Sequence, residues 1–366
     1  MVKILTIDWL VGKIFNMKIL AIDTSCDETA VAVTRNTEII SNVVWSQASL
    51  HASFGGIMPS LAQRQHEERI DWVVDRAIKK SKLGINNLDA IAVTIGNGLG
   101  IALGVGINKA KELAIKYNKP LIPVNHIEAH LLSPFAQPKT ENLKFKIKNL
   151  KLPAFGLVLS GGTTVLCLVK TVGEYEILAE TSDDALGEAL DKSARLLGLG
   201  YPGGAILEKF ARTGDPNKYK LPLPLQNDRI KNRFSYSGLK TAFVRLFNSI
   251  KDPTKQDIAD LAASFQSVAF DHILKVLEFQ IKSNPYSLVT KTLLFGGGVA
   301  NNIEIKKRLR KLCKKYGIKL HVPYTSRLNG DNAGMIGVCA YLKYKDYNLK
   351  EFFNYDSIDR NPRLKL

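Results

Sequence analysis

Residues 17–34 read MKILAIDTSCDETAVAVT, which is the pattern of a buried strand, a polar turn and a second strand. The same succession returns at residues 155–169, FGLVLSGGTTVLCLV, where an apolar run enters a glycine-rich turn and a second apolar run follows. Two such units predict a duplicated fold with two lobes. Each lobe is expected to contribute one phosphate-binding turn to a central cleft.

Strand and helix patterns alternate after the first unit. We expect a hairpin through residues 38–45, a helix from about 60 to 82, a strand at 90–95 and a helix from about 103 to 117. Alternation of this kind predicts an α/β fold with layered sheets. A chain of 366 residues also exceeds what one hydrophobic core usually serves, which supports two lobes.

The domain boundaries follow from shifts in composition. Residues 137–151, QPKTENLKFKIKNLK, are polar and basic, which is typical of a linker or an exposed hairpin. Met17 opens the stronger strand pattern, although MVKILTID at residues 1–8 could form a strand as well. We divide the chain into an N-terminal extension (1–16), an N-terminal lobe (17–136), the basic linker or hairpin (137–151), a C-terminal lobe (152–330) and a terminal helix returning to the N-terminal lobe (331–366).

The net charge is +17, from 51 lysines and arginines against 34 aspartates and glutamates. This excess favours a polyanionic partner such as nucleic acid, or it reflects solvated lysines on helix faces, and composition supports the two equally. No apolar run is long enough to span a membrane and no signal-peptide pattern opens the chain, so we expect a cytoplasmic protein without a membrane partner. The four cysteines are widely spaced, which predicts reduced, mostly buried thiols.

The sequence HIEAH at residues 126–130 places two histidines at i and i+4. On a helix these two imidazoles share one face and can bind one metal ion. Taken alone, the pattern more often marks two exposed or packed histidines. A zinc peptidase would carry a carboxylate directly after the first histidine, and because Ile127 stands there a peptidase is the weaker interpretation.

Two acidic turns could contact a cation or a phosphate. In residues 23–29, DTSCDET, the Asp23 carboxylate and the Ser25 hydroxyl could do so, and an ordinary acidic turn is the alternative. In residues 329–335, NGDNAGM, Asp331 precedes an apolar helix as either its N-cap or an acidic ligand. The turn alone favours the N-cap.

Two glycine-rich turns leave room for a ligand beside the main chain. They are SGGTT at residues 160–164 and FGGGVANN at residues 295–302, the latter just before an expected helix at 303–315. A tight hairpin and a flexible helix cap are the respective alternatives.

Eight segments follow one another along the chain: IDTSCDETAVAV, GGIMPSLAQRQH, NHIEAHLLSP, LSGGTT, DDALGEALDKSARLLGLGYPGG, FSYSGLKTA, GGGVANN and GDNAGMIG. In this order they resemble the tRNA N6-adenosine threonylcarbamoyltransferase family, and FSYSGLKTA in particular resembles its bacterial TsaD branch. The resemblance runs from Met17 to about Gly337. It implies the actin-like ATPase (ASKHA) fold, which agrees with the duplicated strand-turn-strand units.

The resemblance implies that His126, His130 and Asp331 bind one divalent metal ion, with iron favoured over zinc. It also implies a site for an adenine nucleotide, namely threonylcarbamoyl-AMP, ATP or AMP. Asp191 would contact a ribose hydroxyl there, and Gly204 would let the adenine approach. No residue is expected to act as a covalent nucleophile. The residues implied to contact the nucleotide are Val158, Leu159, Ser160, Gly161, Gly162, Asp191, Gly204 and Asn302.

Three positions depart from the family's pattern. Thr163 stands where the family usually has histidine, so a ligand or acid-base role there is in doubt. Asn97 replaces the proline of a Gly-Pro-Gly loop, and Ser60 replaces a glutamate. None of the three removes an implied metal ligand.

The implied reaction transfers threonylcarbamoyl from threonylcarbamoyl-AMP to N6 of the adenosine beside the anticodon (position 37) in tRNAs reading ANN codons, and it releases AMP. A separate threonylcarbamoyl-AMP synthase would supply the donor, and TsaB-like and TsaE-like proteins would be partners. A tRNA substrate fits the basic charge, and we expect Arg64 and Lys240 among its contacts. An actin-like small-molecule kinase or a non-catalytic tRNA-binding scaffold is the alternative, and a metal-dependent peptidase a weaker one.

Overall fold

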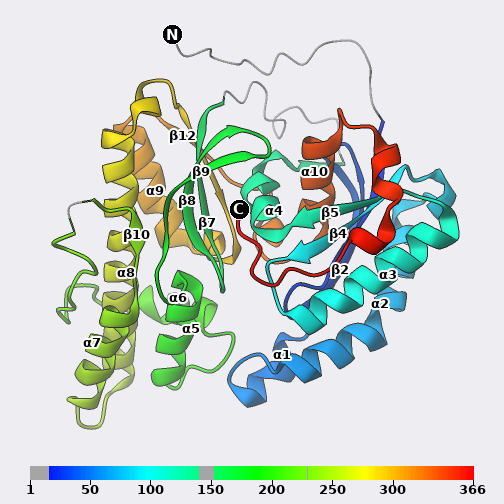
Figure 1. The fold of residues 1–366 in the computed structure, drawn as a ribbon. Helices are drawn as coiled ribbons and strands as arrows, with labels where there is room; N and C mark the ends of the chain where they lie inside the picture. The colour runs from blue at the N-terminus through cyan, green and yellow to red at the C-terminus, as the bar shows by residue number, and fades with distance from the viewer. Residues whose placement is uncertain (1–15, 140–151, 229) are drawn as a thin grey trace. The chain divides into compact units, whose positions relative to one another are not determined.

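The computed structural model describes residues 16–139, 152–228 and 230–366, which divide into two compact units (Figure 1). The first unit contains the described residues within 16–50, 57–139 and 322–366, and the second contains those within 51–56 and 152–321. The expected extension and most of the expected basic linker therefore lie outside the described residues.

The sheet of the first unit is built around a three-stranded antiparallel meander, with further parallel strands on both sides. The strand β1 pairs with β2 and β2 with β3, while β4 and then β5 continue the sheet beyond β1 in parallel, and β6 pairs in parallel with β3. The strands are β1 (Lys18–Asp23), β2 (Glu28–Arg35), β3 (Glu38–Ser46), β4 (Ala90–Gly96), β5 (Leu121–Asn125) and β6 (Gln137–Pro138).

Helices cover both faces of this first sheet, and the size of the sheet's side chains differs between the two faces. Leu20 and Val31 point to the face covered by α2 (Pro59–Ser81) and α3 (Gly100–Tyr117), where they join a large apolar cluster. Most of the alternate positions carry small side chains, such as Ala21, Ala30 and Ala32, and α10 (Ala333–Tyr344) packs closely there together with α4 (His126–Leu132). Both faces are thus buried, which explains the nearly continuous apolar runs in the sequence.

The sheet of the second unit repeats the arrangement of the first. Its meander is β7–β8–β9, β11 and β12 continue it in parallel beyond β7, and β10 pairs in parallel with β9. Order and strand directions match the first sheet, so the predicted duplication is confirmed. The strands are β7 (Ala154–Leu159), β8 (Thr164–Thr171), β9 (Glu174–Thr181), β10 (Arg233–Phe234), β11 (Thr292–Gly296) and β12 (Lys319–His321).

The described part of the second unit contains five α-helices, of which α5 and α6 carry Asp191 and Gly204, and α9 is capped by Asn302. The longest, α8, begins with a capping box in which the side chains of Thr254 and Asp257 accept each other's backbone N–H groups. The helices are α5 (Leu186–Leu196), α6 (Gly203–Ala211), α7 (Ser237–Asn248), α8 (Lys255–Ser283) and α9 (Ile303–Lys315).

Three expected segments can be compared directly. The helices expected near 60–82 and 103–117 are α2 and α3. The helix α3 begins three residues earlier than expected, because the low helix propensity of Gly100 concealed its start in the sequence. Within residues 331–366, α10 ends at Tyr344 and is followed by 3-10 turns and a segment without regular secondary structure. No helix among the described residues is long and apolar enough to cross a membrane.

Candidate functional site

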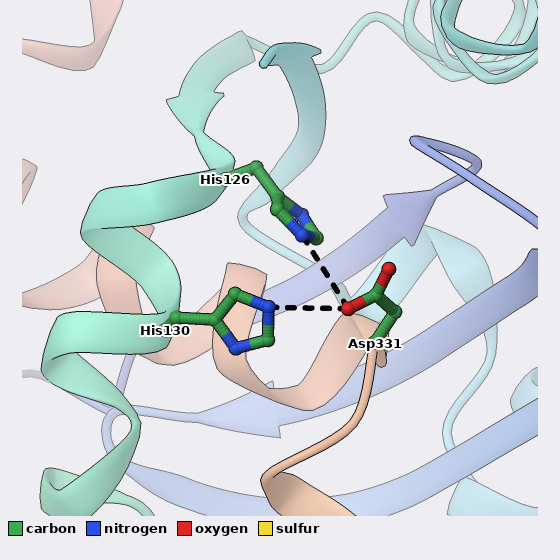
Figure 2. A group of neighbouring side chains, drawn as sticks. All are labelled: His126, His130 and Asp331. Atoms are coloured by element: carbon green, nitrogen blue, oxygen red, sulfur yellow. Dashed lines mark hydrogen bonds and ion pairs between the residues drawn. The ribbon is translucent and has the colours of Figure 1, made fainter. Parts of the chain in front are cut away.

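Two histidines project from one side of α4 toward a common point (Figure 2). The helix begins directly after β5 because Asn125 caps it: the Asn125 side-chain oxygen accepts from Ile127 N at 2.8 Å and from Glu128 N at 3.3 Å. His126 and His130 then lie one turn apart, with ring centroids 4.6 Å apart and the rings nearly perpendicular. Both side chains are buried.

Asp331 completes this cluster from the loop before α10. Its Oδ1 atom lies 3.1 Å from His130 Nε2 and 3.4 Å from His126 Nε2, and the three ligand atoms all lie within 4.8 Å of one another. The N-cap role that the turn alone favoured for Asp331 is wrong. Asn332 caps α10 instead, because its side-chain oxygen accepts from Met335 N at 3.1 Å, which leaves the Asp331 carboxylate to face the histidines.

The cluster fits a divalent metal ion. Metal–nitrogen and metal–oxygen bonds of about 2.0–2.2 Å place neighbouring ligand atoms about 3.0–3.4 Å apart at octahedral to tetrahedral angles, which matches the two histidine–aspartate distances. His126 also has an outer partner of the kind that orients metal-bound histidines, since its Nδ1 lies 3.2 Å from Ser25 Oγ and 3.6 Å from Asp23 Oδ2.

The electrostatics of the metal-free cluster centre on one charged pair. Burial alone would lower the pKa of His126, but the charges of Asp331 and Asp23 outweigh it and raise that pKa to about 9. Burial lowers the pKa of His130, and burial raises that of Asp23. His126 is therefore the imidazolium that balances Asp331, and a cation entering here would take the place of its proton.

The acidic turn after β1 belongs to the surroundings of this cluster. The hydroxyl of Thr24 donates to the Ala102 carbonyl at 2.8 Å and accepts from Gly106 N at 3.1 Å, which fixes the turn against α3. An added Cβ on Gly106 would overlap that same hydroxyl, so the close approach needs glycine. The phosphate or cation role of Asp23 and Ser25 stays a prediction.

The Glu128 carboxylate and the four cysteine thiols are groups that other mechanisms would use, and neither is available here as a base or a nucleophile. Glu128 is the carboxylate within HIEAH, but it is buried and paired with Lys343 Nζ at 2.7 Å, so it cannot serve as a peptidase base. Burial raises the pKa of Cys26 and Cys339 well above the usual value and that of Cys167 and Cys313 to about 12. All four cysteines are unpaired thiols, as expected.

In the second unit, the turn between β7 and β8 is tied to the start of α5. Thr163 N donates to Ser160 Oγ at 3.1 Å, and Gly187 N donates to the Ser160 carbonyl at 3.2 Å. An added Cβ on Gly161 or Gly162 would meet no atom within 4 Å. No contact inside the described protein therefore requires these two glycines, which is consistent with space kept for a ligand.

The neighbouring glycine-rich turn lies directly beside this one. Val158 pairs with Gly296 in the sheet. The next residue, Gly297, has a φ of +93°, and a Cβ there would overlap the Leu159 carbonyl. Glycine is thus required at 297 by conformation and by contact.

Asp191, Gly204 and Asn302 occupy defined positions in the second unit. Asp191 Oδ1 accepts from Gly204 N at 2.6 Å, which joins α5 to the start of α6. Asn302 caps α9 by accepting from Glu304 N and Ile305 N, and it donates to Gln266 Oε1 at 2.8 Å. A cavity of about 410 Å³ adjoins this cap, within the usual range for ligand pockets. Its lining includes Glu208, Gln266, Ile303 and Arg308.

Three contributing residues escaped the sequence analysis. Asn125 could have been found, because asparagine before a helix is a common N-cap. Glu208 supports the start of α9 by accepting from Ile303 N at 2.9 Å, and Gln266 orients Asn302 from the middle of α8. Neither has a local sequence signal, since each acts on a residue far along the chain.

Comparisons with known proteins agree on one family. A sequence model of the TsaD family, described as tRNA N6-adenosine threonylcarbamoyltransferase, matches residues 38–338. Curated proteins of that name from Persephonella marina and a Chelativorans species are 42% and 44% identical to this chain. The matches cover 90% of this chain and 91% of the first relative, and 87% of this chain and of the second relative.

Solved structures show the fold. The HypF protein of T. kodakarensis has a TM-score of 0.59 at 17% identity, covering 89% of this chain and 47% of that one. Component A of the Acidaminococcus fermentans (R)-2-hydroxyglutaryl-CoA dehydratase has a TM-score of 0.51 at 12% identity, covering 90% and 98%. The fold is of the actin-like ATPase type, as the family resemblance implied.

Proposed function

Because the chain belongs to the tRNA N6-adenosine threonylcarbamoyltransferase family, we propose that its donor is threonylcarbamoyl-AMP and its acceptor is N6 of the adenosine beside the anticodon in tRNAs reading ANN codons. Family membership places it among enzymes that modify tRNA. The observation that carries the proposal for the site is the convergence of His126, His130 and Asp331 within 4.8 Å.

We assign the metal to these three side chains, with iron favoured over zinc. Two imidazoles and one carboxylate, with no thiolate, leave coordination positions open and resemble the ligand set of non-haem iron sites. When bound, such an ion acts as a Lewis acid that polarises a carbonyl or phosphoryl oxygen. Ser25 and Asp23 would keep the His126 ring oriented with Nε2 toward the ion.

The reaction replaces one bond to the carbamoyl carbon with another. The N6 amine of adenosine forms a C–N bond to that carbon, the C–O bond to the phosphate breaks and AMP leaves with the electron pair, and the proton that the amine loses passes to water. No enzyme nucleophile is needed, in agreement with four thiols whose pKa values burial raises. The enzyme's contribution is then to orient the weak amine and to stabilise negative charge on the leaving phosphate.

The second unit would bind the adenine nucleotide. The turn at Ser160–Gly162 offers main-chain N–H groups with open space around both glycines, which suits a phosphate. Asp191 would contact the ribose, as its link to Gly204 N holds it at the start of α6. Asn302 is already occupied as the cap of α9 and as donor to Gln266, so its role would be to shape the adjoining cavity.

The partners proposed are tRNA, a TsaB-like protein, a TsaE-like protein and a threonylcarbamoyl-AMP synthase that supplies the donor. The net charge of +17 supports the first of these. Arg64 is exposed on α2, whereas Lys240 is partly buried and paired with Asp184, so a tRNA phosphate at Lys240 would compete with that carboxylate. The exposed side of α9 adds further lysines, among them Lys307, Lys311 and Lys314.

The test is complementation of a bacterial strain that lacks the modification, followed by mass spectrometry of its tRNA nucleosides. The wild-type chain should restore threonylcarbamoyladenosine, and His126→Ala should not. His321→Ala, a partly buried histidine in β12, is the matched control and should behave as wild type. If the wild-type chain is expressed and folded together with its required partners and still does not restore threonylcarbamoyladenosine, the proposed reaction is contradicted.

A further inference from the structure

Residues 358–366, IDRNPRLKL, form a strap on the first unit, with a turn at Pro362–Arg363 closed by a 3.0 Å hydrogen bond from Leu364 N to the Asn361 carbonyl. Asn361 N donates to the Ile95 carbonyl at 2.6 Å, and Gly98 N donates to the Pro362 carbonyl at 3.2 Å. Ile358 anchors the start of the strap in the apolar cluster beneath α2 and α3. Figure 1 shows the strap as the last red segment, ending beside α4. The strap is thus bonded through its main chain to the loop that follows β4.

Three glycines at four-residue spacing make room for the strap. A Cβ added to Gly96 would overlap the Asn361 carbonyl. A Cβ on Gly100 would lie 3.0 Å from Pro362 Cγ, and one on Gly104 would lie 2.9 Å from the guanidinium of Arg360. A side chain at position 96 would therefore meet a main-chain carbonyl of the strap, which cannot move easily, whereas one at position 104 would meet only the flexible end of the Arg360 side chain.

Asn125 joins the strap to the helix that carries the two histidines. Its Nδ2 donates to the Lys365 carbonyl at 2.6 Å, while its Oδ1 caps α4 by accepting from Ile127 N and Glu128 N. The amide is thereby held at both ends, and the next residue in the chain is His126. A carbonyl of the strap thus fixes which way the cap of α4 faces.

The loop beneath the strap reaches the same histidine from its other side. Leu99 N donates to the Ser25 carbonyl at 2.8 Å, and Gly98 lies so close to Ser25 that a Cβ would overlap its carbonyl. The Ser25 hydroxyl lies 3.2 Å from His126 Nδ1. The strap therefore supports His126 both through Asn125 and through the loop that packs on Ser25.

We propose that the strap positions His126 for metal binding, with Asn125 as the positioning residue that links them. This inference rests on the proposed metal site. Residues that orient a metal ligand without touching the ion typically change metal affinity by about 10–100-fold when they are replaced. Glycine at position 96 is then a requirement of the metal site, although Gly96 contacts no ligand atom.

The experiment titrates the metal-free full chain with Co²⁺ and follows visible absorption, which reports both affinity and ligand geometry. Gly96→Ala should displace the strap and weaken Co²⁺ binding at least about tenfold, with an altered spectrum. Gly104→Ala should have little effect, because only a flexible guanidinium must move. Gly84→Ala is the control in the same unit, where the nearest atom to an added Cβ lies at 3.7 Å.

Asn125→Ser provides an independent variant that does not depend on the glycines. Serine retains the N-cap of α4 but lacks the amide donor for the Lys365 carbonyl, so it should weaken Co²⁺ binding as Gly96→Ala does. The double variant should show less than the product of the two effects, because a displaced strap no longer offers that carbonyl. Circular dichroism checks that each variant is folded.

The outcomes separate the two proposals. Failure of the wild-type chain to bind Co²⁺ would overturn the metal site itself. If wild type binds Co²⁺ and a folded Gly96→Ala or Asn125→Ser binds it within twofold of Gly84→Ala, the strap has no positioning role. Fully multiplicative effects in the double variant would likewise overturn the link between the strap and Asn125.

Discussion

Metal binding should depend steeply on pH between 7 and 9. A metal ion at this site must displace the proton of His126, whose pKa is about 9 in the metal-free protein because Asp331 and Asp23 face its ring. Apparent affinity should therefore rise about tenfold per pH unit and level off near pH 9, which leaves it about 100-fold below its limit at pH 7. A histidine with an ordinary pKa would show no such rise above pH 7.

The assay is competition for Zn²⁺ against a chelator of known pH dependence, from pH 6.5 to 9.5. Asp23→Asn removes one of the two carboxylates that raise the pKa of His126, so the bend in the profile should move to lower pH. Asp71→Asn, an exposed aspartate paired with Lys109 in the same unit, is the control and should leave the bend in place. If the Zn²⁺ affinity of the wild-type chain does not change above pH 7, the assignment of His126 and Asp331 as a charged pair is refuted.

The same pKa gives a second readout in the absence of metal. A folded-state pKa of about 9 against 6.5 for an unperturbed histidine means that the charged His126 stabilises the fold fully below pH 6.5. That contribution is lost as pH rises through 9, and it amounts to about 3 kcal/mol for a fully buried group. Urea unfolding of the metal-free chain at pH 6.5 and 9.5 should show this loss, and His126→Gln should remove most of it.

Local patterns were sufficient to predict much of the fold. The two strand-turn-strand units follow from apolar runs broken by polar or glycine turns, and both sheets grow around them. The pairing of His126 with His130 follows from helical spacing alone. In each case the information lies within a few residues, so periodicity captures it.

Contacts between distant residues could not be predicted in this way. Asp331 lies 201 positions from His130, and only the family resemblance connected them. The strap is a clearer case, since the glycines at 96, 100 and 104 are visible in the sequence, while the segment that needs the space lies more than 250 positions further on. Local propensity carries no information about which segment covers a glycine.

Three further measurements test the remaining assignments. Asp191→Ala should weaken binding of an adenine nucleotide by about 1–3 kcal/mol in calorimetry, because it loses a hydrogen bond to a charged group; unchanged affinity would make Asp191 purely structural. Gly337→Ala should destabilise the first unit by about 1–3 kcal/mol in urea unfolding, since its Cβ would lie 2.6 Å from Thr34 Oγ1 in the α10 packing, whereas Gly84→Ala should be near neutral. Affinity for tRNA should fall steeply from about 50 to 200 mM salt, because each neutralised phosphate releases counterions. Each such contact contributes about −0.7 to −0.9 to the slope of log affinity against log salt concentration. Arg64→Ala should reduce that slope by about one contact, and Lys240→Ala by less, because Lys240 already pairs with Asp184. A shallow slope, with partner proteins present and absent, would mean that the charge of +17 does not serve tRNA binding.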